Sequence, residues 1–159
     1  MLAFLFLLGL ALGAVSSDNP QMQPQQDATC PSFWFSFNGR CYKYFNTEMT
    51  WAEAEFHCVS QGGNLVSIHS TEEENFVKYL INSSDPTDGY TWIGLNDIYE
   101  ERRWMWSDGC AAKYLFWHRG QPNNRRREDC VINNWWGKWN DAPCSKAFPS
   151  VCASRTACP

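Results

Sequence analysis

The chain has 159 residues, a formal net charge of −4 and eight cysteines. This length fits one domain with a tail, and the negative charge excludes a generally basic nucleic-acid-binding protein. No Cys-x-x-Cys pair is present to support a zinc site, so an even number of cysteines in a short chain favours disulfide bonds.

Residues 1–17 read MLAFLFLLGLALGAVSS, an apolar run followed by small residues. The run is too short to span a bilayer and is typical of a secretory signal peptide, although no Lys or Arg precedes it. Residues 18–29 lack periodicity and are rich in Gln and Pro, which predicts a flexible leader. Since no later stretch is apolar and long enough for an anchor, we expect a soluble protein secreted to an extracellular, oxidising compartment.

The segment CPSFWFSFNGRCYKYF alternates large apolar and polar residues around Asn38-Gly39. This pattern predicts a β-hairpin with that dipeptide at its turn. Cys30 and Cys41 flank the turn and are candidates to close it as a disulfide.

Two helices are predicted after the hairpin. Thr50 and Glu53 form a capping-box pattern at the start of TWAEAEFHC, and Gly62-Gly63 ends this helix. Ser70 and Glu73 form a second capping-box pattern, which opens TEEENFVKYLIN.

Short strands are predicted in the remainder of the chain. YTWIGL at residues 90–95 is suited to a buried strand, and WMWSDG at residues 104–109 alternates before a turn. CVIN, KWND and FPSVC are each short enough to be strands. Because the helices are grouped and do not alternate with strands, the order predicts an α+β fold.

Oxygen-bearing side chains are concentrated in QPNNRRREDC, residues 121–130, and WNDAPC, residues 139–144. Carboxylates and amide carbonyls are ligands that Ca²⁺ prefers, although each such residue is more often ordinary surface. Pro122 restricts the backbone and is expected to hold the amides on either side of it towards one point. The arginines in the first segment indicate a solvated face. The candidate calcium ligands are Gln121, Asn123, Glu128, Asn140 and Asp141.

These segments together resemble the C-type lectin-like domain, element by element: CYKYF, TWAEAEFHC, GGNLVSIHS, WIGL, WMWSDG, QPN, EDC, WND and the final VC. The resemblance covers residues 30–152 and leaves a tail at 153–159. It is strongest to secreted single-domain lectins of fish and snake venoms, and fish type II antifreeze proteins share the scaffold. It implies a disulfide-stapled fold of two helices, short antiparallel sheets and a long calcium-binding loop. The implied disulfides are Cys30–Cys41, Cys58–Cys152 and Cys130–Cys144.

The resemblance also implies that the five candidate ligands form the principal calcium site and bind the sugar. In the family, two neighbouring sugar hydroxyls complete the coordination of the calcium, while the ligands hydrogen-bond the same hydroxyls. The implied function is a calcium-dependent, non-enzymatic lectin for terminal sugars on microbial or cell-surface glycans, without membrane insertion.

The first motif departs from the family pattern. Members that prefer mannose usually carry Glu-Pro-Asn and those that prefer galactose carry Gln-Pro-Asp, whereas this chain has Gln121, Pro122 and Asn123. Because the motif lacks a carboxylate, we expect weaker binding of both calcium and sugar. We favour galactose-type sugars slightly, because the relatives that look most similar prefer them. Trp135 or Trp136 is a candidate for stacking on the sugar, but packing is the commoner role.

A second calcium site occurs in some members, and such residues are equally common on surface loops. Its implied ligands are Asp97, Glu101, Asn124 and Asp129.

Two cysteines, Cys110 and Cys158, remain outside the implied pairs. They pair with each other or each with a second chain. We favour a disulfide-linked homodimer, because snake-venom lectins carry an interchain cysteine near the position of Cys110. Asn82-Ser83-Ser84 matches the N-glycosylation sequence.

Three other functions are weighed against the lectin. An enzyme is disfavoured, because His57, His69 and His118 accompany no nucleophile or metalloprotease motif. Ice binding on the antifreeze scaffold has no sequence signature here. A calcium-independent protein-binding module is favoured by the Gln-Pro-Asn motif and opposed by the intact WND motif and Glu128.

Overall fold

The computed structural model describes residues 29–159, so the predicted signal peptide and nearly all of the predicted leader lie outside the described residues. Two helices and eight strands follow one another along this part of the chain. They are β1 (Phe35–Phe37), β2 (Arg40–Met49), α1 (Trp51–Ser60), β3 (Gly63–Leu65), α2 (Thr71–Ser84), β4 (Thr91–Asn96), β5 (Met105–Trp106), β6 (Cys130–Trp135), β7 (Lys138–Ala142) and β8 (Phe148–Ser154).

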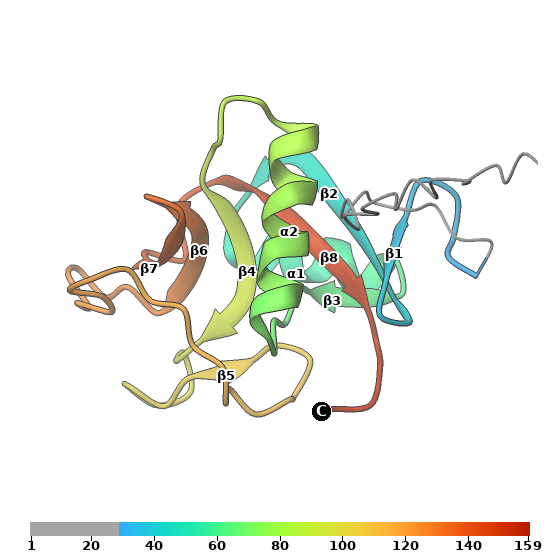
Figure 1. Cartoon of the computed structure of the whole chain (residues 1–159). Coiled ribbons are helices and arrows are strands. Elements are labelled where there is room, and N and C mark those ends of the chain that lie inside the picture. Colours follow the sequence, from blue (N-terminus) through green and yellow to red (C-terminus); the bar gives the residue numbers. More distant parts are fainter. Residues whose placement is uncertain (1–28) are drawn as a thin grey trace, which may run out of the picture.

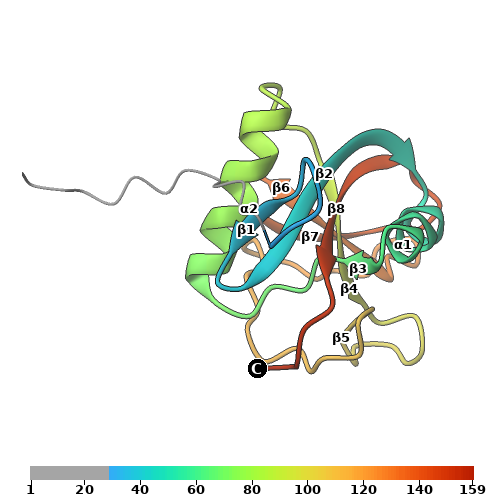
Figure 2. The same ribbon diagram turned by 90° about the vertical axis from the view of Figure 1, so that its right-hand side faces the viewer.

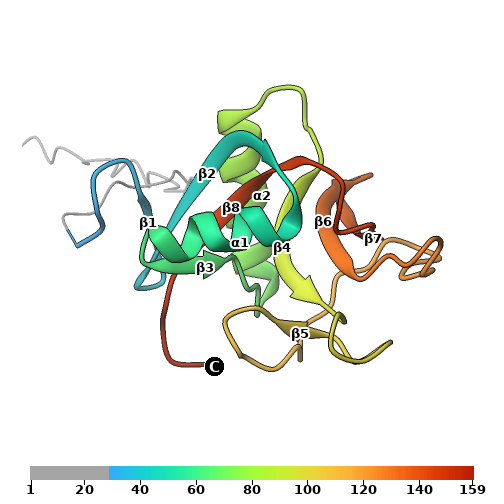
Figure 3. The same cartoon turned by 180° about the vertical axis from the view of Figure 1, so that it is seen from behind.

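The strands form one sheet in the order β1-β2-β8-β4-β6-β7, with β3 paired to β8 and β5 paired to β4. Helix α2 crosses one face of this sheet and α1 lies on the other (Figure 1, Figure 3). Seen after a quarter turn, the two helices flank β2 and β8 (Figure 2). The predicted α+β class is confirmed.

The predicted hairpin is confirmed, because β1 and β2 pair antiparallel with Phe37 opposite Arg40. The two residues between them, Asn38 and Gly39, have φ angles of 46° and 75°. Both values lie in the left-handed region, which Gly and Asn tolerate better than other residues. The dipeptide therefore sets the turn, and Cys30 is bonded to Cys41 beside it.

The capping box at Thr50 is confirmed, with the Glu53 carboxylate accepting a hydrogen bond from the Thr50 backbone N–H at 2.9 Å. The box predicted at Ser70 is only half formed. The Ser70 hydroxyl accepts from the Glu73 N–H, but the Glu73 carboxylate does not accept from the Ser70 N–H. One of its oxygens accepts from the buried Arg40 guanidinium at 2.9 Å, and the other accepts from the His69 backbone N–H at 2.6 Å.

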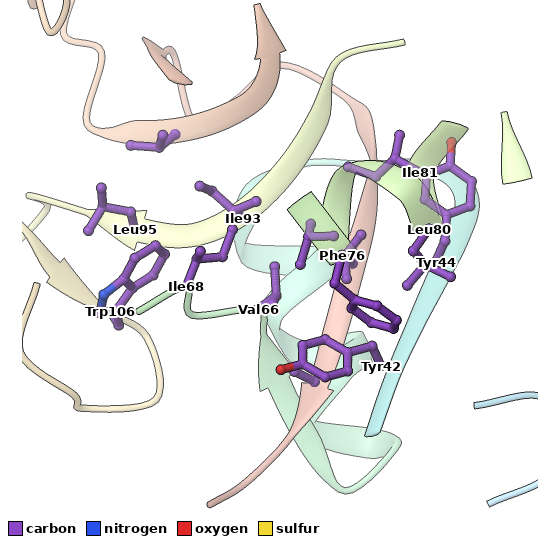
Figure 4. Packing of buried hydrophobic residues seen from close by; sticks show 14 of the residues in the cluster. Tyr42, Tyr44, Val66, Ile68, Phe76, Leu80, Ile81, Ile93, Leu95 and Trp106 are labelled. Atoms are coloured by element: carbon purple, nitrogen blue, oxygen red, sulfur yellow. The ribbon is translucent and has the colours of Figure 1, made fainter. Parts of the chain in front are cut away.

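Two apolar clusters occupy the two faces of the sheet. In β8, Val151 and Ala153 belong to the cluster beneath α2, whereas Cys152 between them belongs to the cluster beneath α1. This alternation follows from the two-residue period of a strand. Figure 4 shows the first cluster, in which Phe76 of α2 lies beside Tyr42. The sheet is therefore buried on both sides at its centre.

A buried carboxyl group of α2 fixes β7 in place. The two oxygens of Glu74 accept hydrogen bonds from the Asn133 amide, at 3.0 Å, and the Trp139 indole, at 2.9 Å. Burial raises the pKa of Glu74 to about 7. Since Trp139 directly precedes Asn140 and Asp141, this contact helps to position two candidate ligands.

All eight cysteines are paired within the chain. Three of the bonds are those that the resemblance implied. The fourth joins Cys110 to Cys158, so the favoured interchain disulfide is wrong and the intramolecular alternative is what the structure contains. Strand β8 continues to Ser154, two residues past the expected domain end, and this bond then holds the remaining tail beside the segment that follows β5 (Figure 1). The chain end is close enough to Cys110 to bond there, which spacing alone did not reveal.

Candidate functional site

The candidate site lies where the long connection from β5 to β6 passes beside β7. The connection is tied to the strand by backbone hydrogen bonds, from the His118 N–H to the Trp139 carbonyl at 2.8 Å and from the Trp139 N–H to the Phe116 carbonyl at 3.0 Å. The Gln121 N–H donates to the His118 carbonyl at 2.9 Å. The first candidate ligand is therefore held close to the strand that carries Asn140.

Asp141 joins the loop to β7 directly. One oxygen of its carboxylate accepts from the Asn123 backbone N–H at 3.1 Å, and the other accepts from the Asn124 N–H at 2.6 Å. The side-chain oxygen of Asn123, Oδ1, in turn accepts from the Arg125 N–H at 3.0 Å. The peptide bond between Gln121 and Pro122 is cis. The two segments predicted from sequence to act together are thus brought into contact.

Two of the candidate oxygens lack any partner. The side-chain oxygens Gln121 Oε1 and Asn140 Oδ1 are buried and have no hydrogen bond to any described residue. Buried carbonyl oxygens are almost always satisfied, and an orphan costs free energy unless a donor or a cation completes it. A bound cation would satisfy carbonyl oxygens of this kind.

Glu128 provides the second carboxylate of the site. Its pKa is raised, first by burial and then by the negative charge of Asp141. A divalent cation bound beside these two carboxylates would offset their like charges. The donor set of two carboxylates and three amides therefore fits calcium.

A second cluster of acidic groups lies nearby. Carboxylate oxygens of Asp97, Glu101 and Asp129 all lie within 4.8 Å of one another. Asp97 Oδ1 is buried without a partner among the described residues, and burial together with Glu101 and Asp129 raises the pKa of Asp97. Three of the four residues implied for the second calcium site are thus gathered. The fourth, Asn124, uses its side-chain oxygen to accept from the Glu128 N–H at 3.1 Å.

A groove of about 220 Å³ adjoins both clusters. Trp104 and Arg102 form one side of it, facing Pro122 and Asn123. The sequence did not predict a role for Trp104 and Arg102, because nothing in their local pattern places them beside the loop. Trp104 packs edge-on against Trp117, with ring centroids 4.8 Å apart.

The tryptophans named as stacking candidates lie at the other end of the β6–β7 hairpin. Trp135 packs against Tyr90 with ring centroids 5.1 Å apart, which confirms the packing role. Trp136 occupies the turn and is 82% exposed. Asn140 and Asp141 pair with Ile132 and Val131, several residues from that turn. Neither indole is therefore placed beside the candidate ligands.

Another cleft, of about 430 Å³, lies between the β1–β2 turn and the C-terminal residues. Arg40 lines it, but its guanidinium already donates to the Ser154 and Ser67 carbonyls and to Glu73. The Arg40 guanidinium is thus already bonded within the fold.

The chain belongs to the C-type lectin family, since residues 47–154 match the family described as "Lectin C-type domain". The lactose-binding lectin l-2 of Anguilla japonica is 41% identical over 136 residues, which cover 81% of this chain and 80% of that protein. A C-type lectin mannose-binding isoform of Oxyuranus scutellatus is 35% identical over 157 residues, or 95% and 96% of the two chains. Among solved structures, herring type II antifreeze protein superposes with a TM-score of 0.74 at 38% identity, covering 80% of this chain and 99% of that chain.

These similarities indicate a carbohydrate-binding family and no enzymatic one. Within residues 29–159, no helix has the length and apolar character needed to cross a membrane.

Proposed function

We propose that this protein is a secreted, calcium-dependent lectin that binds terminal sugars. Gln121, Asn123, Glu128, Asn140 and Asp141 would hold the ion. Calcium bound there supplies open coordination positions for two neighbouring hydroxyls of a sugar. The amide NH₂ groups donate to the sugar oxygens, and the two carboxylates accept from the sugar hydroxyls.

The observation that carries this proposal is the pair of unpartnered buried oxygens on Gln121 and Asn140. They come from separate segments that Asp141 ties together. A solvated surface turn would leave these oxygens in contact with water, and a packed turn would satisfy them from within the protein.

We favour galactose-type over mannose-type sugars only slightly. One similar protein is named for lactose and another for mannose, so the names support both classes. The Gln121-Pro122-Asn123 motif takes one amide from each family pattern. The expected ligands are glycans on microbial or cell surfaces, in keeping with a role in innate immunity.

Two further features belong to this proposal. Asp97, Glu101, Asn124 and Asp129 are proposed as a second calcium site, supported by the three clustered carboxylates. Asn82 is exposed in the last turn of α2 and is proposed as a glycosylation site. A disulfide-linked dimer is not proposed, because every cysteine is bonded within the chain.

The proposal is tested by retention on immobilised galactose and mannose, with and without a chelator. Asn140→Ala should abolish retention and leave the calcium-free melting temperature unchanged, because the oxygen that it removes has no partner in the fold. Asp141→Ala should also abolish retention but lower the calcium-free stability, since two backbone N–H groups lose their acceptor.

Asn46→Ala, at an exposed position on β2, is the matched control and should bind sugar normally. Retention that survives the chelator would exclude the metal mechanism.

Ice binding is the second candidate, because herring type II antifreeze protein shares this fold at 38% identity. Thermal hysteresis of the purified protein, with no retention on either sugar, would favour it.

A further inference from the structure

Three consecutive arginines, Arg125, Arg126 and Arg127, occupy the loop between Asn123 and Glu128. All three are exposed, and no ion pair reaches their guanidinium groups within the described part of the chain. The positive charges of Arg125 and Arg126 partly offset the rise in the pKa of Glu128, so the loop borders the candidate sugar site.

The backbone of this loop is unusual for its residue types. Arg126 and Arg127 have φ angles of 61° and 56°, and Asn124 precedes them at 49°. The left-handed region is costly for residues with long side chains, and such conformations collect at binding sites. An ordinary polar turn would not place two successive arginines in this conformation.

The loop carries three positive charges in a chain whose formal net charge is −4. The carboxylates around it, Glu128 and Asp141 at the principal site and the acidic cluster of Asp97, Glu101 and Asp129, are calcium ligands in the proposed function, so bound calcium would offset their charge. Arg102 adds a further exposed guanidinium across the adjoining groove, which Trp104 and Asn123 also line. With calcium bound, the guanidinium groups of the loop and of Arg102 would be the excess charge beside the sugar.

We propose that the arginine loop selects glycans carrying an anionic substituent, either a sulfate ester or a carboxylate, next to the hydroxyls bound at the calcium site. The guanidinium fork matches the oxygens of both anions and forms paired, charge-assisted hydrogen bonds with them. This inference rests on the proposed function, since the neutral part of the sugar must bind at the same site.

The test compares three immobilised sugars: the parent hexose that the chelator experiment retains, its 6-sulfate and its uronic acid. The sulfate and carboxylate arms distinguish the two sources of negative charge. We expect the wild-type protein to bind at least one anionic sugar roughly fivefold more tightly than the parent, the gain from one exposed charge pair of about 1 kcal/mol. This preference should weaken as salt is raised, because exposed charges are screened.

The triple substitution Arg125→Gln, Arg126→Gln, Arg127→Gln should abolish the preference and leave binding of the neutral parent unchanged. The matched control removes three exposed positive charges elsewhere, through Lys113→Gln, Lys146→Gln and Arg155→Gln. The control should keep the full preference. A preference lost equally in both variants would indicate a general effect of net charge and would overturn the inference.

The remaining outcomes separate the inference from the function beneath it. If the neutral parent sugar binds in a chelator-sensitive way and neither anionic sugar binds more tightly than it does, the inference is overturned and the proposed function is not. No retention on any of the three sugars overturns the proposed function, and the inference with it. Binding of the anionic sugars that survives the chelator, or equal binding of phosphatidylserine vesicles or DNA, places the interaction outside the calcium site and also overturns the inference.

Discussion

The chemistry of the candidate site depends on which of its oxygens carry charge. Only Glu128 and Asp141 are carboxylates, and Gln121, Asn123 and Asn140 offer neutral carbonyls. A neutral carbonyl binds a hard cation less strongly than a carboxylate does, and a neutral acceptor holds a sugar hydroxyl less strongly than a charged one. The site is therefore expected to bind calcium weakly for its family.

Asn123→Asp tests this expectation. The substitution keeps the oxygen that accepts from the Arg125 N–H and adds one negative charge to the ligand set. Calcium affinity should rise by about tenfold, because a charged carboxylate replaces a neutral amide oxygen as a ligand of the ion. Isothermal titration calorimetry of calcium into chelator-treated protein measures it. Asn46→Asp is the control at a remote exposed position, and an equal gain there would attribute the effect to net charge.

At the level of elements, the long connection from β5 to β6 is held in position by three kinds of bond. Backbone hydrogen bonds tie His118 to Trp139, the Asp141 carboxylate holds the loop from the β7 side, and a disulfide fixes the start of the connection to the chain end. The Cys130–Cys144 bond adds a covalent link across the β6–β7 pair that ends the connection. A loop of this length needs such ties, because its own residues form few repetitive contacts.

The Cys110–Cys158 bond spans 48 residues. Cys110→Ser with Cys158→Ser should lower the free energy of unfolding by about 4 kcal/mol on the chain-entropy account, because the unfolded chain regains a long loop. Denaturant titration measures this. Removal of the Cys30–Cys41 bond, which spans 11 residues, should cost about 3 kcal/mol.

Non-reducing electrophoresis of the wild-type protein checks the connectivity. A monomer band is expected. A dimer band that disappears in the Cys110→Ser, Cys158→Ser variant would restore the interchain assignment.

At the scale of the whole molecule, the sheet is enclosed by two apolar clusters, and the principal candidate calcium site lies at its edge beside β7. A ligand that binds only the folded state stabilises the fold by mass action. In the proposed function two chain segments supply the calcium ligands, so unfolding would release the ion.

Calcium at a hundredfold excess over its dissociation constant should therefore raise the melting temperature by on the order of 10 °C. The raised pKa values of Glu128 and Asp97 mean that protons compete for these ligands at a higher pH than usual. The calcium-dependent increment should shrink as the pH falls, with the loss beginning above pH 4.5, the ordinary value for Glu. Thermal melts with calcium or chelator across a pH series measure it, and a constant increment would contradict the assignment of these carboxylates as ligands.

The sequence by itself determined the features that depend on local chemistry. Asn38-Gly39 specified a hairpin turn, Thr50 and Glu53 specified a helix start, and the short apolar runs specified strands, because each acts through neighbours a few residues away. The family pattern extended this to three disulfides, and it is the source of the proposed ligand set.

Only the tertiary structure decided which distant groups meet. Arg40 bonds to Glu73, Glu74 accepts a hydrogen bond from Trp139, Cys158 is bonded to Cys110, and Trp104 and Pro122 line one groove. Each of these contacts joins residues far apart in the chain, and their pairing follows from how the two helices and the long connection pack on the sheet. No local pattern encodes that packing, because the free energy that selects it comes from burying both faces of the sheet at once.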